Sequence, residues 1–141
     1  MAADSARKLC ILCHGSSFDK LHTIIGMTAT AASMGMEAHL FLTYGALWRV
    51  AKGTLDEAEP AHDDAEVNIL YQRAIDGGVL PSLEDLLNSA REIGKVRLYA
   101  CTTSIKVLRL TPDELSKVDA PMGHATFLEM ASQPDARLVV V

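Results

Sequence analysis

The sequence lacks long apolar runs and an excess of positive charge. Its 141 residues contain no uninterrupted apolar stretch of about 18 residues, the length that a membrane-spanning helix needs. The start, Met1-Ala2-Ala3-Asp4-Ser5, has no basic region followed by an apolar run, so we expect no secretory signal. The net charge of −5 argues against a nucleic-acid-binding surface, which requires clustered Lys and Arg. Neither a membrane nor a nucleic acid is predicted as a partner.

Cysteine is scarce, and the common nucleotide and hydrolase motifs are missing. Three cysteines form no disulfide framework, and free thiols fit a reducing, cytoplasmic compartment. His22, His39 and His62 have no metal-ligand spacing, so we predict no metal site and no cofactor. The sequence has no P-loop, no G-x-G-x-x-G and no G-x-S-x-G elbow.

Alternating apolar strands and amphipathic helices are present instead. They predict an α/β fold in which both faces of a mostly parallel sheet are covered. The length fits one domain, covering residues 1–141. We expect strands at 8–13, 37–43, 96–101, 118–120 and 137–141, and helices at 19–34, 46–51, 82–93, 102–110, 123–132 and from Thr111 onward.

The segment 53–81 differs in composition from the rest of the chain. Acidic residues outnumber basic ones there, and Val67, Leu70, Tyr71 and Ala74 repeat at helical spacing. We interpret it as an acidic insertion with a loop and a helix. It is either a solvated excursion or a lid or subunit contact.

Ligand chemistry in a parallel sheet gathers at the carboxyl ends of the strands. Four loops are predicted at this edge: 14–18, 43–46, 101–104 and 121–124. They provide the candidate binding residues, which are His14, Ser16, Tyr44, Thr102, Thr103, Ser104 and His124.

Cys101 is the best candidate for a reactive group. It ends a predicted strand and precedes Thr102-Thr103-Ser104, which can begin a helix, so its thiol can point at unpaired N–H groups. Lowering a thiol pKa from about 8.5 to about 7 needs roughly 2 kcal/mol, which a helix N-terminus supplies in favourable geometry. Position alone also allows an inert core cysteine.

The spacing Cys10-Ile11-Leu12-Cys13 matches C-x-x-C only in letters. In a strand, residues three apart point to opposite faces, with Cα atoms about 10 Å apart, too far for a disulfide. We therefore expect both cysteines to be structural.

Histidines fall on two of the four loops. His14 and His124 could each hold a charge or donate a proton near Cys101. The turn His14-Gly15-Ser16-Ser17 could also bind an anion at the start of the next helix.

Three segments, in their order and spacing, resemble a known family. Leu98-Tyr99-Ala100-Cys101-Thr102-Thr103-Ser104 resembles the strand–cysteine–helix segment of the DsrE/DsrF-like, TusD-like sulfur-relay family. The stretch 123–131 is similar to the Gly-x-Ala-Thr-Phe-Leu stretch near that family's C-terminus, and the opening strand and helix, 10–42, also match.

The resemblance implies a three-layer α/β/α domain with a five-stranded sheet, assembled as homo-oligomers, often trimers or hexamers. It implies a sulfur carrier or sulfurtransferase in which Cys101 accepts sulfane sulfur as a persulfide. The sulfur would pass between donor and acceptor proteins of TusA-like or rhodanese-like type. Two alternatives stay open: a non-catalytic assembly module with a buried Cys101, and a small anionic-ligand-binding domain that uses the turn at His14.

Overall fold

The structure is a computed structural model that describes residues 7–141. The segment Met1–Ser5, considered above for a signal, lies outside the described residues. Within residues 7–141, no helix has the length and apolar character that crossing a membrane requires.

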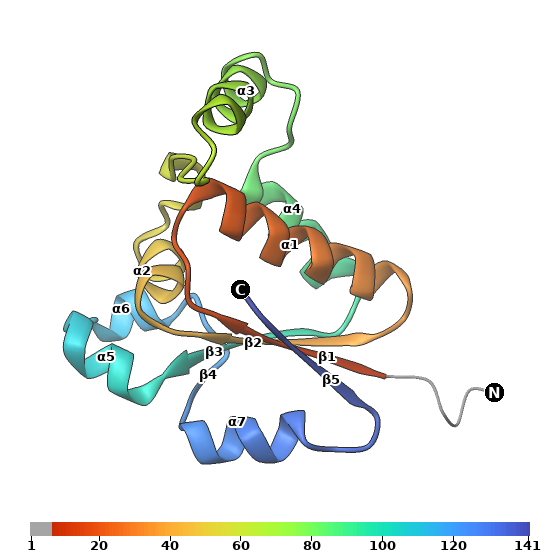
Figure 1. Cartoon of the computed structure of the whole chain (residues 1–141). Coiled ribbons are helices and arrows are strands. Elements are labelled where there is room, and N and C mark those ends of the chain that lie inside the picture. The colour runs from red at the N-terminus through yellow and green to blue at the C-terminus, as the bar shows by residue number, and fades with distance from the viewer. Residues whose placement is uncertain (1–6) are drawn as a thin grey trace.

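The centre of the molecule is a five-stranded sheet in which every pairing is parallel. The strands run in the order β4-β3-β2-β1-β5, so the first strand lies inside the sheet and the last one at its edge (Figure 1). Their bounds are β1 Lys8–Cys13, β2 Glu37–Leu42, β3 Val96–Cys101, β4 Ala120–Met122 and β5 Ala136–Val140. The predicted α/β class is confirmed.

Helices cover both faces of the sheet, which makes three layers (Figure 1). Helices α1 (Phe18–Ser33) and α4 (Leu83–Ile93) lie on one face, and α7 (His124–Ala131) lies on the other. Because successive side chains of a strand point to opposite faces, the side chains of β3 contribute to both layers. Val96, Leu98 and Ala100 belong to the core under α1 and α4, whereas Tyr99 and Cys101 belong to the cluster under α7.

Three further helices lie at the carboxyl ends of the strands. They are α2 (Tyr44–Lys52), α5 (Thr102–Leu108) and α6 (Pro112–Leu115). Thr111 and Glu114 form the reciprocal capping box that starts α6, with Pro112 in its first turn, as the sequence predicts. A Lys52–Glu114 ion pair joins α2 to α6 and lowers the pKa of Glu114 to about 2.

The acidic segment 53–81 contains a short 3-10 helix, η2 (Leu55–Glu57), and helix α3 (Ala65–Asp76). Leu55 is buried, and the Asp56 carboxylate caps α4 by accepting the N–H groups of Leu83 and Glu84. Helix α3 stands away from the sheet (Figure 1), and all of its residues are exposed or half-buried. The predicted helix is confirmed.

The fourth strand begins two residues later than the sequence predicts. The N–H of Val118 bonds to the carbonyl of Leu115, which extends the turn after α6. Asp119 then bonds to Leu98 through its own N–H and through its carboxylate. Pairing with β3 therefore starts at Ala120, and Pro121 fits this short edge strand because an edge position does not need every donor.

Candidate site at the carboxyl edge of the sheet

Polar side chains connect the ends of β1 and β2. The Thr43 hydroxyl donates to the carbonyl of Cys13 at 3.1 Å, and the Thr43 N–H donates to the same carbonyl at 2.9 Å. Nδ1 of His14 lies 3.1 Å from the same hydroxyl oxygen, so Nδ1 carries the proton and donates to it. Nε2 of His14 is then left as an acceptor on an exposed ring.

A second set of contacts connects β2 to α5. The Tyr44 N–H donates to Oγ of the fully buried Ser104 at 3.1 Å, and the rings of His14 and Tyr44 meet edge to face at 5.7 Å. Tyr44 has a positive φ of 37°, an unusual backbone for a bulky residue. Ser16 packs so closely on Gly45 that a Cβ atom added at position 45 would lie only 2.6 Å from the Cβ of Ser16. Four predicted residues, His14, Ser16, Tyr44 and Ser104, are thus brought together.

Cys101 ends β3 and precedes α5, as predicted, but its thiol is covered. Its exposed fraction is 1%, and its side chain joins the cluster of Cys10, Phe41, Met122 and Phe127 under α7. The sequence predicts that backbone N–H groups of α5 point at this sulfur, and that prediction is wrong for the described chain. Cys101 occupies the N-cap position of α5, but its side chain makes no hydrogen bond to the helix. Strand alternation is the reason, because it turns this side chain toward α7.

Thr102 and Thr103 are exposed on the first turn of α5, and their roles stay predictions.

An aromatic stack forms part of the apolar cluster around Cys101. Phe41 and Phe127 stack with ring centroids 4.7 Å apart, and the His124 ring meets Phe41 edge-on at 5.5 Å. His124 is exposed and begins α7, so it lies where this helix meets the carboxyl edge. The only helix on this face of the described chain is α7, of 8 residues.

The other two cysteines point to opposite faces of β1, as the strand interpretation predicts. Cys10 belongs to the cluster under α7, and Cys13 to the core under α1 and α4. Burial raises the pKa of both thiols, and it raises the pKa of Cys13 far more strongly. Both are fully buried, so the C-x-x-C spacing is structural here.

Sequence reasoning missed a row of three polar side chains on the α7 face. Nε2 of His39 donates to the Glu37 carboxylate at 2.9 Å, and Nδ1 of the same ring is hydrogen-bonded to the Tyr99 hydroxyl at 2.8 Å. This hydrogen bond holds the pKa of Glu37 below its usual value, and burial raises the pKa of Tyr99. The signal was the alternation of Glu37 and His39 along one strand face.

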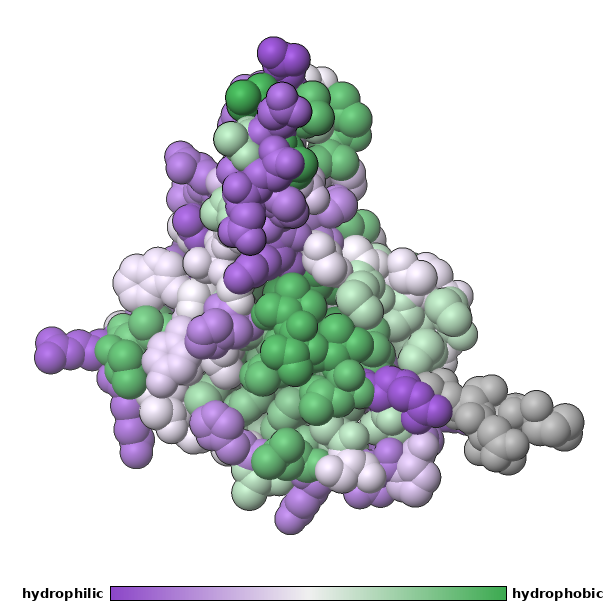
Figure 2. Space-filling model, in the orientation of Figure 1, coloured by the Kyte–Doolittle hydropathy of each residue, from purple (hydrophilic) through white to green (hydrophobic). Residues whose placement is uncertain are grey.

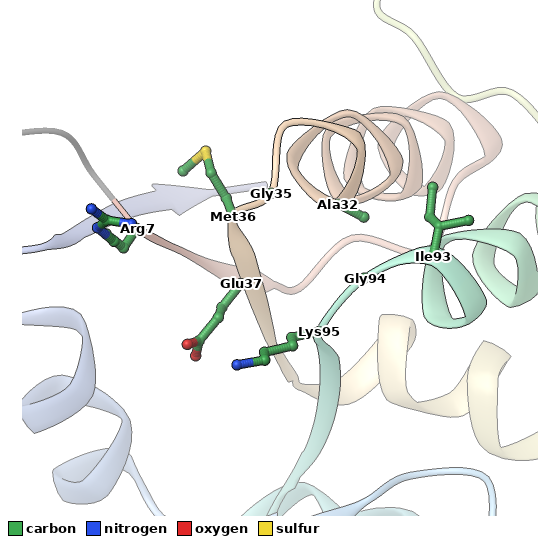
Figure 3. Close-up of a pocket in the computed structure, with 8 residues that line it drawn as sticks. All are labelled: Arg7, Ala32, Gly35, Met36, Glu37, Ile93, Gly94 and Lys95. Carbon is green, nitrogen blue, oxygen red and sulfur yellow. The ribbon is translucent and has the colours of Figure 1, made fainter. Parts of the chain in front are cut away.

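A hollow of about 350 Å³ lies at the opposite end of the sheet. Figure 3 shows the side chains of Glu37 and Lys95 extending to one side of it, with Ala32 and Ile93 on the other. Its residues flank the amino ends of β1, β2 and β3, away from the predicted loops.

The start of α1 offers little to an anion. The Phe18 N–H is already bonded to the carbonyl of Glu59 at 2.9 Å. Asp19 places a carboxylate in the first turn, and negative charge there repels a bound anion. The anion-binding alternative therefore gains no support from this geometry.

The all-parallel α/β/α sheet, with a cysteine where β3 runs into α5, defines a class of small three-layer α/β proteins whose candidate site lies at the carboxyl edge. A model described as the DsrE/DsrF/DrsH-like family matches residues 62–139, which include β3, β4, α7 and all but the last residue of β5. The chain belongs to this family. No curated protein matches the sequence.

Proposed function

We propose that this chain is an intracellular sulfur carrier that holds sulfane sulfur as a persulfide on Cys101 and passes it to a thiol of a partner protein. Membership of the DsrE/DsrF/DrsH-like family supports a sulfur-relay role. The observation that singles out Cys101 is its position at the carboxyl end of β3, within the matched segment and on the face that α7 covers. Cys10 and Cys13, by contrast, lie outside that segment.

The proposed reaction is a sulfur-for-sulfur exchange without net oxidation. The Cys101 thiolate attacks the outer sulfur of a donor's persulfide, and a new S–S bond forms on Cys101. The donor's own S–S bond breaks, and its electron pair leaves with the donor thiolate, which takes up a proton. In the second step, the thiolate of an acceptor protein attacks the outer sulfur of the Cys101 persulfide. The S–S bond on Cys101 breaks, and Cys101 leaves as a thiolate. Donor and acceptor proteins of TusA-like or rhodanese-like type fit this chemistry.

Access to the thiol requires α7 to move. A thiol that is 1% exposed in one chain cannot meet another protein's sulfur without local opening. Within residues 7–141, one short helix covers this face of the sheet, and the aromatic stack beneath it is formed by Phe41 and Phe127. We expect partner binding at the carboxyl edge, by residues such as His14, Tyr44, Thr102, Thr103 and His124, to favour the open form.

The test is to load the protein with polysulfide and weigh the intact chain. Wild type should gain the mass of one sulfur atom, which a thiol reductant removes, and Cys101→Ser should not gain it. Cys10→Ser and Cys13→Ser are the matched controls and should load like wild type. If Cys101→Ser still gains sulfur at full stoichiometry, Cys101 is not the acceptor.

A second candidate is a subunit of an assembly without chemistry. The observation in its favour is the near-complete burial of Cys101 and the missing capping bond to its sulfur. This hypothesis predicts that Cys101 is alkylated only in denaturant. In a sulfur carrier, Cys101 should be alkylated under native conditions at neutral pH.

A further inference from the structure

The second half of α1 and the turn after it carry no charge. Residues 23–36 contain no Asp, Glu, Lys, Arg or His, although the outer face of a surface helix normally carries charged groups. Met34, at the end of this stretch, is 70% exposed. Figure 2 shows a broad apolar area in the middle of the view, where Figure 1 places α1 and β5. An exposed apolar area of this kind marks a binding surface.

A hollow lies between this part of α1 and strand β1, and we call it the α1 groove. Its volume is about 420 Å³, which is in the range of small-molecule sites. The Thr30 hydroxyl already donates to the carbonyl of Gly26 at 2.9 Å, so the groove is apolar there. A Cβ atom added at Gly26 would meet no neighbouring heavy atom within 4 Å, so the missing side chain leaves open space. The lining residues include Leu9, Gly26, Met27, Thr30, Met34 and Met36.

The charge beside the α1 groove is positive. Arg137 of β5 pairs with Leu9 of β1, so the two side chains lie on the same face of the sheet. The Arg137 guanidinium donates to the carbonyl of the preceding residue at 3.0 Å and forms no ion pair within residues 7–141. The nearby carboxylates act on the opposite face, where Glu37 is hydrogen-bonded and Asp135 adds to the burial that raises the pKa of Cys10. An anionic group at the groove therefore has Arg137 as its partner.

We propose that the α1 groove binds a single-chain anionic amphiphile, a molecule of the fatty-acid class. Its alkyl tail lies along Met27 and Met34, whose flexible thioether side chains adapt to an apolar ligand. Its carboxylate accepts hydrogen bonds from Arg137, which has N–H donors beyond the one used within β5. Apolar burial and one charge pair thus act on the two ends of the same molecule.

A small amphiphile suits this site better than a second protein. A stable protein interface takes roughly 800 Å² from each partner. The α1 groove, by contrast, is lined by one helix, the turn after it and one residue of β1. It also lies on the face opposite α7, so binding needs no motion of that helix and does not depend on sulfur transfer. Failure of either proposal therefore leaves the other standing.

Isothermal titration calorimetry of the full chain tests the chemistry of the ligand. The probe is dodecanoate below its critical micelle concentration, and it should bind saturably. Octanoate should bind at least about tenfold more weakly, because its shorter tail buries less apolar surface. Dodecyltrimethylammonium has the same tail with a cationic head group and should also bind at least about tenfold more weakly.

Methyl NMR locates the ligand on the protein. With ¹³C-labelled methionine methyl groups, the signals of Met27, Met34 and Met36 should shift when dodecanoate is added. Met122 and Met130, which belong to the cluster under α7, are internal controls and should not shift.

Two variants test the two ends of the ligand. Gly26→Leu fills the open space and favours the helix, so dodecanoate binding should fall at least about tenfold with the helical circular-dichroism signal kept. Arg137→Gln should weaken dodecanoate about tenfold and leave the binding of dodecyltrimethylammonium unchanged. Arg97→Gln, at an exposed arginine on the α7 face, is the matched control and should bind dodecanoate like wild type.

Four results would overturn the proposal. They are no saturable binding of dodecanoate, equal affinity for the anionic and the cationic amphiphile, undiminished binding in Gly26→Leu, and shifts at Met122 or Met130 in place of the groove methionines. Groove methionines that shift on dilution of the protein but not with dodecanoate would assign the face to a second copy. Binding to phosphatidylglycerol vesicles without binding of free dodecanoate would assign it to a membrane surface. Each of these two outcomes also rejects the proposal.

Discussion

The two faces of the sheet are covered in different ways. Under α1 and α4 lies the larger core, where Ile11, Leu40 and Leu98 are almost fully buried. The face under α7 has a smaller cluster that ends against a polar row, Glu37, His39 and Tyr99. Within residues 7–141, two helices therefore cover one face, and one short helix with polar groups beside it covers the other.

The three thiols lie on different faces of the sheet, so different helices cover them. Cys13 lies in the larger core, and burial raises its pKa strongly, so it is a structural residue. Cys10 and Cys101 lie in the smaller cluster, where displacement of α7 exposes fewer apolar groups. Local opening costs less where less apolar surface is exposed, so the proposed reaction belongs on the α7 face.

The largest expected effect is on the aromatic stack under α7. Phe127→Ala should lower the free energy of unfolding by about 3 kcal/mol, because it removes a buried ring and leaves a cavity beside Phe41. Urea denaturation measures this loss. Leu128→Ala, at a neighbouring exposed residue, is the control and should change stability by less than about 0.5 kcal/mol. Equal losses in the two variants would mean that Phe127 does not anchor this helix.

Alkylation of the three thiols compares the faces directly. Under native conditions at neutral pH, iodoacetamide should modify Cys101 at least about tenfold faster than Cys13, since opening α7 is the cheaper motion. Mass spectrometry of the digested protein gives the three rates separately. Phe127→Ala should accelerate Cys101 and leave Cys13 slow. If all three thiols react at one rate, only global unfolding exposes them.

The polar row on the α7 face should make a smaller contribution. Tyr99→Phe removes the hydroxyl that is hydrogen-bonded to His39 and should cost about 1 kcal/mol of unfolding free energy. Tyr71→Phe is the matched control, since the Tyr71 hydroxyl makes no hydrogen bond within residues 7–141. A Tyr99→Phe protein as stable as the control would show that the bond adds nothing to stability.

The smallest effect is a pH dependence at Glu37. Its pKa is lower in the folded chain than in the unfolded one, chiefly because it accepts a hydrogen bond from His39. The unfolded state therefore takes up a proton first as the pH falls. The resulting stabilisation is complete above the ordinary carboxyl pKa and is lost below it. Because this side chain is partly exposed, we expect only a few tenths of a kcal/mol.

Denaturation of wild type and Glu37→Gln at several pH values measures this contribution. The difference in unfolding free energy should shrink between about pH 6 and about pH 3. A difference that stays constant across this range would mean that the carboxylate charge is not responsible.

Much of the fold could be predicted because local patterns and global packing agree. The alternation of apolar strands with amphipathic helices predicted the parallel sheet, and β3 was placed at Val96–Cys101 as observed. Caps at Ser82 and Thr111 marked two helix starts, and both side chains accept the predicted backbone N–H. The fourth strand was misplaced because Asp119, a polar residue, decides through a tertiary bond where its pairing begins.

The candidate site was predicted only in part. Strand ends in a parallel sheet meet at one edge, so the loops that contain His14, Tyr44 and Ser104 could be grouped from the sequence. The burial of Cys101 could not, because it depends on Phe41 and Phe127, which lie far apart in the chain and stack only after folding. The His39–Tyr99 bond likewise joins two strands and has no local signature.

The sequence by itself determined the strands, the helices and the alternation that directs each side chain to one face, because these follow from interactions between near neighbours. Only the tertiary structure decided which face receives the thinner cover, and so how far each sulfur lies from solvent. Burial is a property of the groups that pack around an atom, and most of those groups come from distant parts of the chain.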